Sequence, residues 1–180
     1  MKAVRFHTTG GPDALVYEEV PDPAIEDDDV LIRVDAAGVN FADVMRRRGD
    51  DYPEQSPTPF TLGAEVAGTV AAVGKAVTTI PVGTPVLATP GAGGYAQYIR
   101  VPASIVIPLP PGLDAVRAAA LMAHGLTAAL VLRQAARLAP GETVLVEAAA
   151  GGVGSFAVQL AKQYGAGKVI AAASTPEKRA

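Results

Sequence analysis

The stretch that decides the fold reads VLVEAAAGGVGSFAVQLAK and runs from Val144 to Lys162. It passes from an apolar strand through a cluster of glycines into a segment with helical spacing, and a second β-branched run, KVIAAA, follows. A strand, a helix and a second strand in this order predict one βαβ unit. The strand Val144–Val146 is apolar throughout, which is typical of a parallel strand buried on both faces. The helix is expected to place these residues on the face that packs against the sheet: Val153, Phe156, Ala157, Leu160, Ala161 and Tyr164.

The glycine cluster matches the dinucleotide-binding pattern G-x-G-x-x-G, with Ala149, Gly151 and Gly154 at its three positions. A small first residue permits a tight turn, a second without a side chain admits a pyrophosphate, and a third lets the helix lie close to the strand. Backbone N–H groups at the start of the helix would point at the anion, and the helix dipole would add to the attraction. A turn chosen only for close packing is the alternative. The predicted cofactor contacts here are Ala150, Gly151, Gly152, Val153 and Gly154.

The second strand of this unit ends without the acidic residue that commonly holds the ribose hydroxyls of NAD. Ser174, Thr175, Lys178 and Arg179 follow it instead. Hydroxyls and two cations suit a 2′-phosphate, so these four residues predict NADP(H) as the cofactor. The alternative, which is compatible with this role, is that Ser174 or Thr175 caps a helix whose first residue is Pro176.

The N-terminal part of the chain reads as β structure, because short β-branched or aromatic runs alternate with Gly and Pro clusters. The run VLIRVDAAGV illustrates the pattern, since Val30, Ile32 and Val34 face one way and the intervening residues the other. Many short strands of this kind predict a partly closed antiparallel barrel. The composition becomes rich in Ala and Leu near Pro110, with helical spacing broken at Gly125. We therefore expect two domains, residues 1–120 and 121–180.

Composition excludes several functional classes. The 180 residues are 49% hydrophobic and carry a formal net charge of -3, which favours neither nucleic acid nor an anionic membrane surface as a partner. The absence of Cys excludes disulfides and thiolate zinc sites. The first residues lack the apolar core of a signal peptide, so we expect a soluble, cytoplasmic protein. The run Arg46-Arg47-Arg48 is interpreted as a solvated helix end.

The stretch LGAEVAGTVAAVGKAV carries a further pattern: Gly63-x-Glu65-x-x-Gly68, five residues, and then Gly74-x-x-Val77. Together with the GLTA run that begins at Gly125 and with PGETVLVEAAAGGVG, it resembles the medium-chain dehydrogenase/reductase superfamily, and within it the zinc-free quinone oxidoreductases related to zeta-crystallin. The resemblance covers essentially the whole chain. It implies a GroES-like, partly open β-barrel followed by the first part (βαβ) of a Rossmann domain. Members of the superfamily are much longer, so the chain is interpreted as truncated at its C-terminus.

Departures from the zinc-dependent members of this superfamily predict that no metal is bound. Those members carry His after the first Gly of the pattern, where this chain has Ala64, and they use Cys ligands that are absent here. The two histidines, His7 and His124, lack the converging partners that a metal site needs. Glu65 is interpreted either as catalytic or as a buried structural carboxylate paired with a basic group.

The resemblance also assigns roles to residues. Asn40 would hydrogen-bond near the nicotinamide and the substrate, Phe41 to Met45 would border the cofactor, Tyr52 would close the substrate pocket, and Thr127 would meet the cofactor. Each has a plainer alternative. Asn40 is also suited to cap the short helix that follows it, Tyr52 to ordinary packing, and Thr127 to a hydrogen bond with its own helix backbone.

The predicted function is NADPH-dependent hydride transfer to a quinone or an α,β-unsaturated carbonyl without zinc, with Asn40 and Tyr52 as the catalytic residues. An enoyl-thioester reductase of the same superfamily, and a non-catalytic NADPH-binding or assembly module, are the alternatives. The expected partners are a small electrophilic acceptor and, in the complete protein, a second copy in a homodimer, without nucleic acid or membrane. The truncated chain is expected to turn over poorly.

Overall fold

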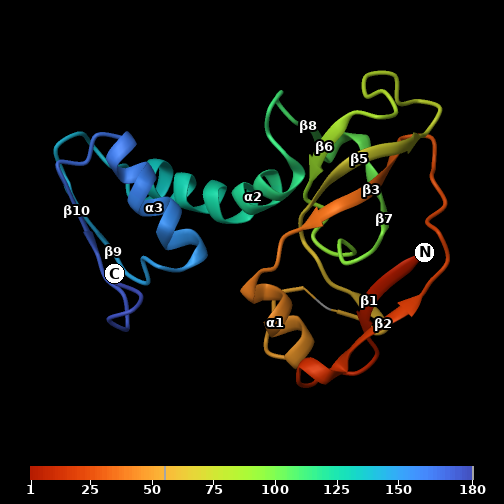
Figure 1. Cartoon of the computed structure of the whole chain (residues 1–180), viewed down its shortest axis with the longest axis horizontal. Coiled ribbons are helices and arrows are strands. Elements are labelled where there is room, and N and C mark those ends of the chain that lie inside the picture. Colours follow the sequence, from red (N-terminus) through yellow and green to blue (C-terminus); the bar gives the residue numbers. More distant parts are fainter. Residues whose placement is uncertain (55, 180) are drawn as a thin grey trace. The chain divides into compact units, whose positions relative to one another are not determined.

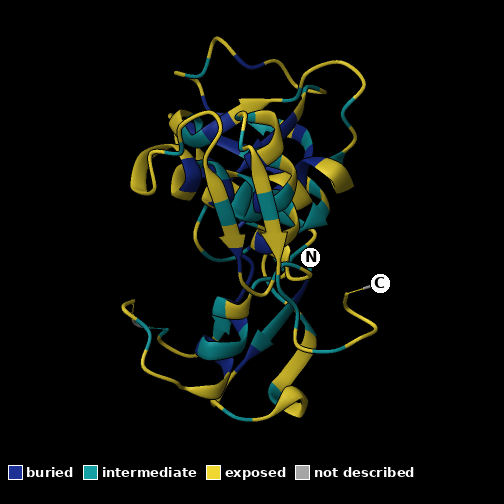
Figure 2. Ribbon diagram, turned by 90° about the vertical axis from the view of Figure 1, so that its left-hand side faces the viewer, coloured by how far each residue is buried: buried dark blue, intermediate teal, exposed yellow. Residues whose placement is uncertain are grey.

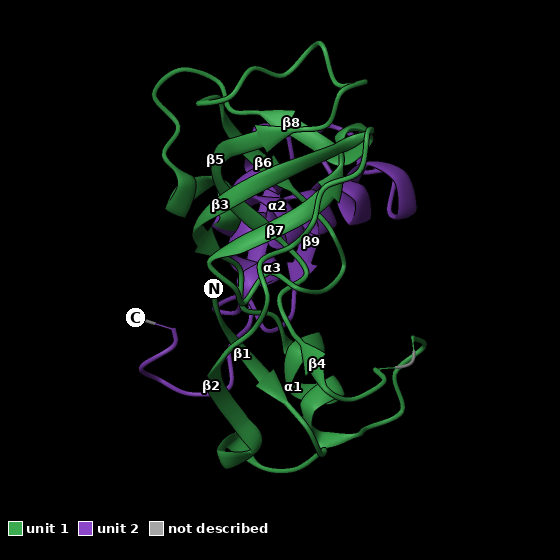
Figure 3. Cartoon of the chain, turned by 90° about the vertical axis from the view of Figure 1, so that its right-hand side faces the viewer, with its two compact units in different colours: residues 1–119 green, residues 120–180 purple. Residues whose placement is uncertain are grey.

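The computed structural model describes residues 1–54 and 56–179, and it divides into two compact units, residues 1–119 and 120–180 (Figure 3). Unit 1 is built mainly from two antiparallel sheets, and unit 2 contains a parallel strand pair with its helix. The fold class predicted from the sequence, a GroES-like β domain followed by the first part of a Rossmann domain, is confirmed. The sheets are open at their edges rather than closed into a barrel.

The larger sheet of unit 1 has five strands in the order β7-β3-β5-β6-β8 (Figure 1). Their bounds are β3 Asp29–Ala37, β5 Val66–Val73, β6 Pro85–Ala88, β7 Tyr98–Pro102 and β8 Val106–Pro108. The smaller sheet has the order β2-β1-β4, with β1 Lys2–Phe6, β2 Leu15–Glu19 and β4 Phe60–Thr61. Short 3-10 turns at Pro12–Ala14 and Ala103–Ile105 join successive strands.

Alternation along β3 positions the core of unit 1 as predicted. Val30 and Ile32 are fully buried, whereas Arg33 on the opposite face is exposed. Bulges between Leu31 and Ile32, and between Val34 and Ala36, shift the register against β5. The core consists of β-branched and small side chains from all five strands and the loop before β6: Val30, Ile32, Val66, Val70, Ile80, Val86, Ala88, Ile99, Val101 and Val106.

The helix α1, Phe41–Arg48, follows β3 and ends at Gly49, whose φ of 79° is the left-handed conformation that glycine adopts without a Cβ penalty. The interpretation of its three arginines as a solvated helix end is wrong for two of them. Arg46 and Arg47 are buried, and Arg48 alone is exposed. The Arg47 guanidinium donates to the Gly10 carbonyl, and the Arg46 guanidinium pairs with Glu54. These tertiary partners, which local sequence does not reveal, remove both charges from solvent.

Unit 2 contains most of the long helix α2, Ala115–Leu130, which passes into a π turn at Val131–Ala135. The predicted break at Gly125 is wrong, because α2 runs through it without interruption. A Cβ at Gly125 would lie 3.7 Å from the ring of Phe156, an ordinary contact distance, so packing does not require a glycine there. Two strands of unit 2 pair in parallel, namely β9, Thr143–Val146, and β10, Lys168–Ala171. The helix α3, Gly152–Gln163, connects them in the chain.

One face of the β9–β10 pair packs against α3, where Ala157 and Ala161 are buried beside Val146 (Figure 1). Among the residues predicted to form the packed face of α3, only Val153 is exposed. Val153 lies in the first turn of α3, outside the cluster of buried side chains around Ala157 and Ala161. The prediction that the first strand is buried on both faces is also wrong. Leu145 is 60% exposed and Ile170 is exposed beside it, so the second face of the pair is uncovered (Figure 2).

Among the described residues, one helix is long and apolar enough to cross a membrane by length and composition alone, namely Ala115–Ala135. A core helix of a soluble protein meets the same criterion. This segment contains two arginines, and Ala118, Ala119, Ala128 and Leu132 on it are buried in the fold.

Candidate functional site

The turn between β9 and α3 connects the end of a strand to the start of a helix, the arrangement in which phosphate-binding loops occur. Within this turn Ala148 has a φ of 51°, the left-handed conformation, one residue before the predicted first position at Ala149. A Cβ at Gly154 would overlap the carbonyl oxygen of Ala148 and lie 2.7 Å from the Ala149 Cα. Gly151 is less crowded, since its nearest neighbour would be the Ala148 oxygen at 3.2 Å. Gly154 is therefore required for close packing, and Gly151 leaves its surface open to a ligand.

The left-handed conformation of Ala148 leads to a prediction. An L-residue there carries a steric cost of roughly 1–2 kcal/mol that glycine does not. Glycine also gains conformational freedom in the unfolded chain, which offsets part of the benefit. We expect Ala148→Gly to stabilise unit 2 by about 0.5–1 kcal/mol in chemical denaturation. The matched change Ala150→Gly, at a residue without positive φ, should be destabilising instead. Equal effects of the two changes would contradict the assignment.

A pocket of about 380 Å³ opens beside this turn, a volume within the usual range for small-molecule sites. It lies between the carboxyl ends of β9 and β10, which is where parallel α/β sheets bind their ligands. Four of the predicted cofactor residues line it: Ala150, Gly151, Ser174 and Lys178. The remaining lining residues are Glu147, Ala148, Ala172 and Ala173.

The segment after β10 forms a turn rather than a helix, and Thr175 makes the capping hydrogen bond that the alternative interpretation allowed for. Arg179 N–H donates to the Pro176 carbonyl at 2.9 Å, and Lys178 N–H donates to the Thr175 hydroxyl oxygen at 3.4 Å. A backbone hydrogen bond and, after it, the hydrogen bond from the same Thr175 side chain lower the pKa of Glu177. Thr175 therefore stabilises the turn that brings Lys178 to the pocket. Thr175 and Arg179, which were also predicted to contact the cofactor, are not among the described residues that line this pocket.

Gly152, Val153 and Gly154 form the first turn of α3, whose backbone N–H groups have no intrahelical acceptor. His124 from α2 lies against this turn, since a Cβ at Gly152 would be 2.6 Å from its ring. Gly152 thus leaves the space that the His124 ring fills. Thr127, one turn beyond His124, is exposed on α2.

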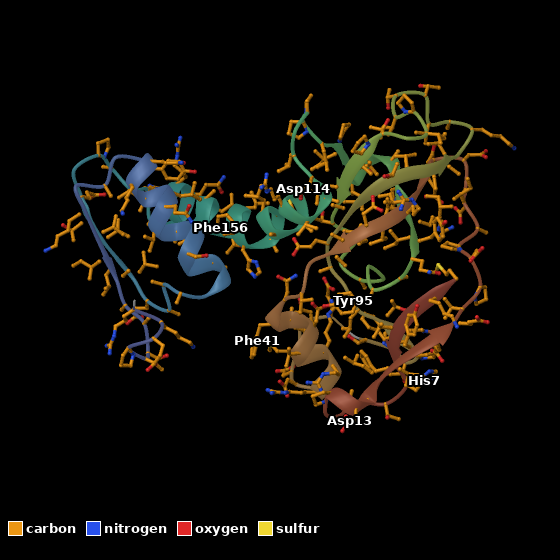
Figure 4. The ribbon with its side chains drawn as sticks, in the orientation of Figure 1. His7, Asp13, Phe41, Tyr95, Asp114 and Phe156 are labelled. Carbon is orange, nitrogen blue, oxygen red and sulfur yellow. The ribbon has the colours of Figure 1, made fainter. Side chains whose placement is uncertain are left out.

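The predicted residues of unit 1 gather around α1. Asn40 is its N-cap residue, which confirms the capping role, and it is half-buried. Phe41 is 70% exposed and projects from the start of the helix (Figure 4), while Met45 is half-buried one turn later. Tyr52 follows in the next loop, with the Arg46 guanidinium 4.5 Å above its ring. Arg46 therefore holds Tyr52 by a cation–π contact within the loop.

Two buried carboxylates, Asp43 and Glu65, lie beneath Asn40 and organise this site. Asp43 accepts hydrogen bonds from the Asn40 backbone N–H at 2.8 Å, the Gly63 N–H at 3.2 Å and the Tyr95 hydroxyl at 3.0 Å. Glu65 accepts one from the Asn40 amide Nδ2 at 3.0 Å. Burial, followed by the charge and hydrogen bond of Asp43, raises the pKa of Tyr95 above its ordinary value. The Tyr95 hydroxyl therefore stays protonated and donates.

The glycines near these carboxylates have steric causes. A Cβ at Gly38 would overlap the Glu65 carboxylate, and one at Gly63, whose φ is +98°, would lie 2.7 Å from the Tyr95 ring. A Cβ at Gly68 would overlap the Arg33 carbonyl at the bulge between β3 and β5. Gly38 thus makes room for the Glu65 carboxylate, Gly63 for the Tyr95 ring, and Gly68 for the close approach of β3 to β5.

Sequence reasoning missed Tyr95 and Glu147, and it included Asp43 only within the range Phe41 to Met45, without a role of its own. Asp43 has a signal, since a residue three positions after an Asn N-cap is suited to a capping box. Tyr95 lies 52 residues from Asp43 in the chain, so its contact is purely tertiary. Glu147 follows directly on β9, at the strand end where ligand contacts concentrate in α/β folds.

The histidines do not gather with other ligands. His7 Nε2 lies 2.9 Å from the Glu18 carboxylate at an exposed position, and His124 is on α2. Within residues 1–54 and 56–179, no group of three or more His, Cys, Asp or Glu side chains could hold a metal ion.

Comparisons with known proteins agree with this architecture. Residues 26–111 match the alcohol dehydrogenase GroES-like domain family. A quinone oxidoreductase of Pseudomonas aeruginosa is 42% identical over 98% of the chain, and a 2-haloacrylate reductase of a Burkholderia species is 40% identical. The crystal structure of Escherichia coli quinone oxidoreductase complexed with NADPH superposes with a TM-score of 0.92 at 34% identity, over 99% of this chain. The chain spans 54% of the length of each of these three proteins.

Proposed function

We infer from its place in the medium-chain dehydrogenase/reductase superfamily, among proteins resembling quinone oxidoreductases, that the chain is part of an NADPH-dependent, zinc-free reductase of quinones or α,β-unsaturated carbonyls. The observation that carries the proposal is the pocket between the ends of β9 and β10, where the open turn at Gly151 meets Ser174 and Lys178. The relatives support the acceptor class, because a quinone and a 2-haloacrylate share a double bond conjugated to an electron-withdrawing carbonyl group.

The residues of unit 2 fit a dinucleotide with a 2′-phosphate. The first-turn N–H groups of α3 and the helix dipole would hold the pyrophosphate, which approaches over Gly151. The Lys178 ammonium and the Ser174 hydroxyl would bind the 2′-phosphate as charge-assisted donors. NADPH, when bound, supplies the hydride.

Residues of unit 1 would act on the acceptor. Reduction places negative charge on the acceptor oxygen, and a donor aimed at that oxygen stabilises the transition state. Asn40 provides amide hydrogens, and Tyr52 provides a hydroxyl in a loop anchored by Arg46. A zinc ion is not needed in this scheme, and the chain has no Cys to replace the absent His at Ala64.

Fluorescence titration of the chain with NADPH and NADH tests the cofactor assignment. Lys178→Ala should weaken NADPH binding about tenfold, about 1.4 kcal/mol, and leave NADH binding nearly unchanged, because only NADPH carries the 2′-phosphate. The control Lys162→Ala, in the last turn of α3, removes the same charge from outside the pocket lining. Equal loss for both cofactors would refute the role of Lys178.

Glu147 provides a second test of which cofactor is bound, because it lines the same pocket. A carboxylate there disfavours a phosphate and can accept hydrogen bonds from ribose hydroxyls, although the acid that holds ribose in NAD-binding sites follows the second strand. Tighter binding of NADH than of NADPH by the unaltered chain would favour that second cofactor. Glu147→Gln should then change NADH binding more than NADPH binding.

A further inference from the structure

The Glu65 carboxylate is placed against Asn40 with little freedom to move. Its side chain is 2% exposed and lies just before β5, and Gly38 leaves the space that the carboxylate fills. Its Oε1 accepts a hydrogen bond from Asn40 Nδ2 at 3.0 Å. The backbone of Asn40 is held as well, because its N–H donates to Asp43. The residue is therefore fixed at both its main chain and its side chain.

This contact determines the orientation of the Asn40 amide. A carboxylate only accepts hydrogen bonds, so it turns the NH₂ group of the amide toward itself and the oxygen away. An NH₂ group carries two hydrogens, and Glu65 takes one of them. The capping box adds a second constraint, in which the Asn40 side-chain oxygen faces the backbone N–H of Asp43, so loss of the carboxylate would remove one of the two contacts that set the orientation of the amide.

We propose that Glu65 is a positioning residue, which orients the Asn40 amide so that its second Nδ2 hydrogen is donated to the oxygen of the acceptor. The assignment rests on the proposed function, in which Asn40 acts as that donor. In this proposal Glu65 does not touch the reacting atoms, and its effect on the reaction is exerted through Asn40. The strength of its effect therefore depends on its ability to accept a hydrogen bond.

Two substitutions separate this role from packing. Glu65→Gln keeps an oxygen acceptor and the side-chain volume, whereas Glu65→Leu keeps burial and removes the acceptor. With NADPH and 1,4-benzoquinone, Glu65→Gln should retain kcat within about threefold of the unaltered chain, while Glu65→Leu should lower kcat on the order of 100-fold, the loss expected when a reacting geometry is misplaced. NADPH affinity should stay unchanged in both. Glu19→Gln, at an exposed carboxylate of unit 1, is the control.

A second measurement does not depend on turnover or on the leucine variant being folded. In nitrogen-15 spectra of the unaltered chain, one Nδ2 hydrogen of Asn40 should exchange with solvent more slowly than the other. In Glu65→Leu this difference should disappear, and in Glu65→Gln it should persist. An Asn40 amide with two equally exchanging hydrogens in the unaltered chain would overturn the proposal.

A double-mutant comparison tests whether Glu65 acts only through Asn40. In an Asn40→Ala background, Glu65→Leu should cause no further loss of kcat. A full additional 100-fold loss would overturn the positioning role. If the unaltered chain oxidises no NADPH with quinones or enones, the proposed function fails in this chain, and the Asn40 spectra alone decide whether Glu65 orients the amide.

Discussion

Gly154→Ala should destabilise unit 2 by about 3 kcal/mol or more and abolish NADPH binding. The new Cβ would overlap the Ala148 carbonyl oxygen and press on the Ala149 backbone, and neither is a flexible side chain that can move aside. Overpacking of a well-packed site commonly costs 1–3 kcal/mol, and contact with fixed backbone lies at or beyond the upper end. Chemical denaturation and an NADPH titration measure the two effects.

Gly151→Ala provides the matched control for this change. Its Cβ would meet only the Ala148 oxygen at 3.2 Å, and its φ of -83° is accessible to alanine. We expect a loss of stability below about 1 kcal/mol, together with a large loss of NADPH affinity, because the methyl group would occupy the path of the pyrophosphate. The packing interpretation of Gly154 is wrong if the two variants are equally stable.

The sequence predicted well where one local rule determines the structure. Alternation located the buried face of β3, and spacing located the face of α3 that carries Ala157 and Ala161. It failed where a tertiary contact overrides local preference. Arg46 and Arg47 are buried because loop partners receive their hydrogen bonds. The break expected at Gly125 is absent, because a single glycine costs a helix only about 1 kcal/mol.

The exposed face of β9 shows a different limit of sequence reasoning. The run Val144–Val146 is apolar at every position, and such a run predicts burial on both faces. The structure covers only one face, which leaves Leu145 exposed. The apolar pattern of a strand indicates that both of its faces favour burial, but it does not show whether other helices or strands of the chain cover them.

The candidate site was predictable to a similar extent. The glycine turn and the residues after β10 follow from the chemistry of phosphate binding, and four of them line one pocket. The two carboxylates near Asn40 were not predictable as a group. Asp43 lies on α1, whereas Glu65 lies 22 positions later in the chain, just before β5. Only the folded chain places Asp43, Glu65 and Tyr95 together.

The contact between Tyr95 and Asp43 makes the stability of unit 1 sensitive to alkaline pH. The folded pKa of Tyr95 lies above the value of about 10 expected in the unfolded chain. Above pH 10 the unfolded chain therefore loses this proton while the folded chain keeps it. Stability conferred by the protonated phenol is complete below pH 10 and is lost progressively as the pH rises toward the raised folded pKa.

Tyr95→Phe isolates this effect from the titration of other groups. At pH 8 the variant should be less stable by about 1.5–3 kcal/mol, because the Asp43 carboxylate loses one of its donors. The gap between the two proteins should narrow as the pH rises from 10 to 11.5, since only the unaltered chain carries the ionisable phenol. Denaturant titrations at several pH values measure the gap, and a gap that stays constant over this range would show that Tyr95 ionises equally in the folded and unfolded chains.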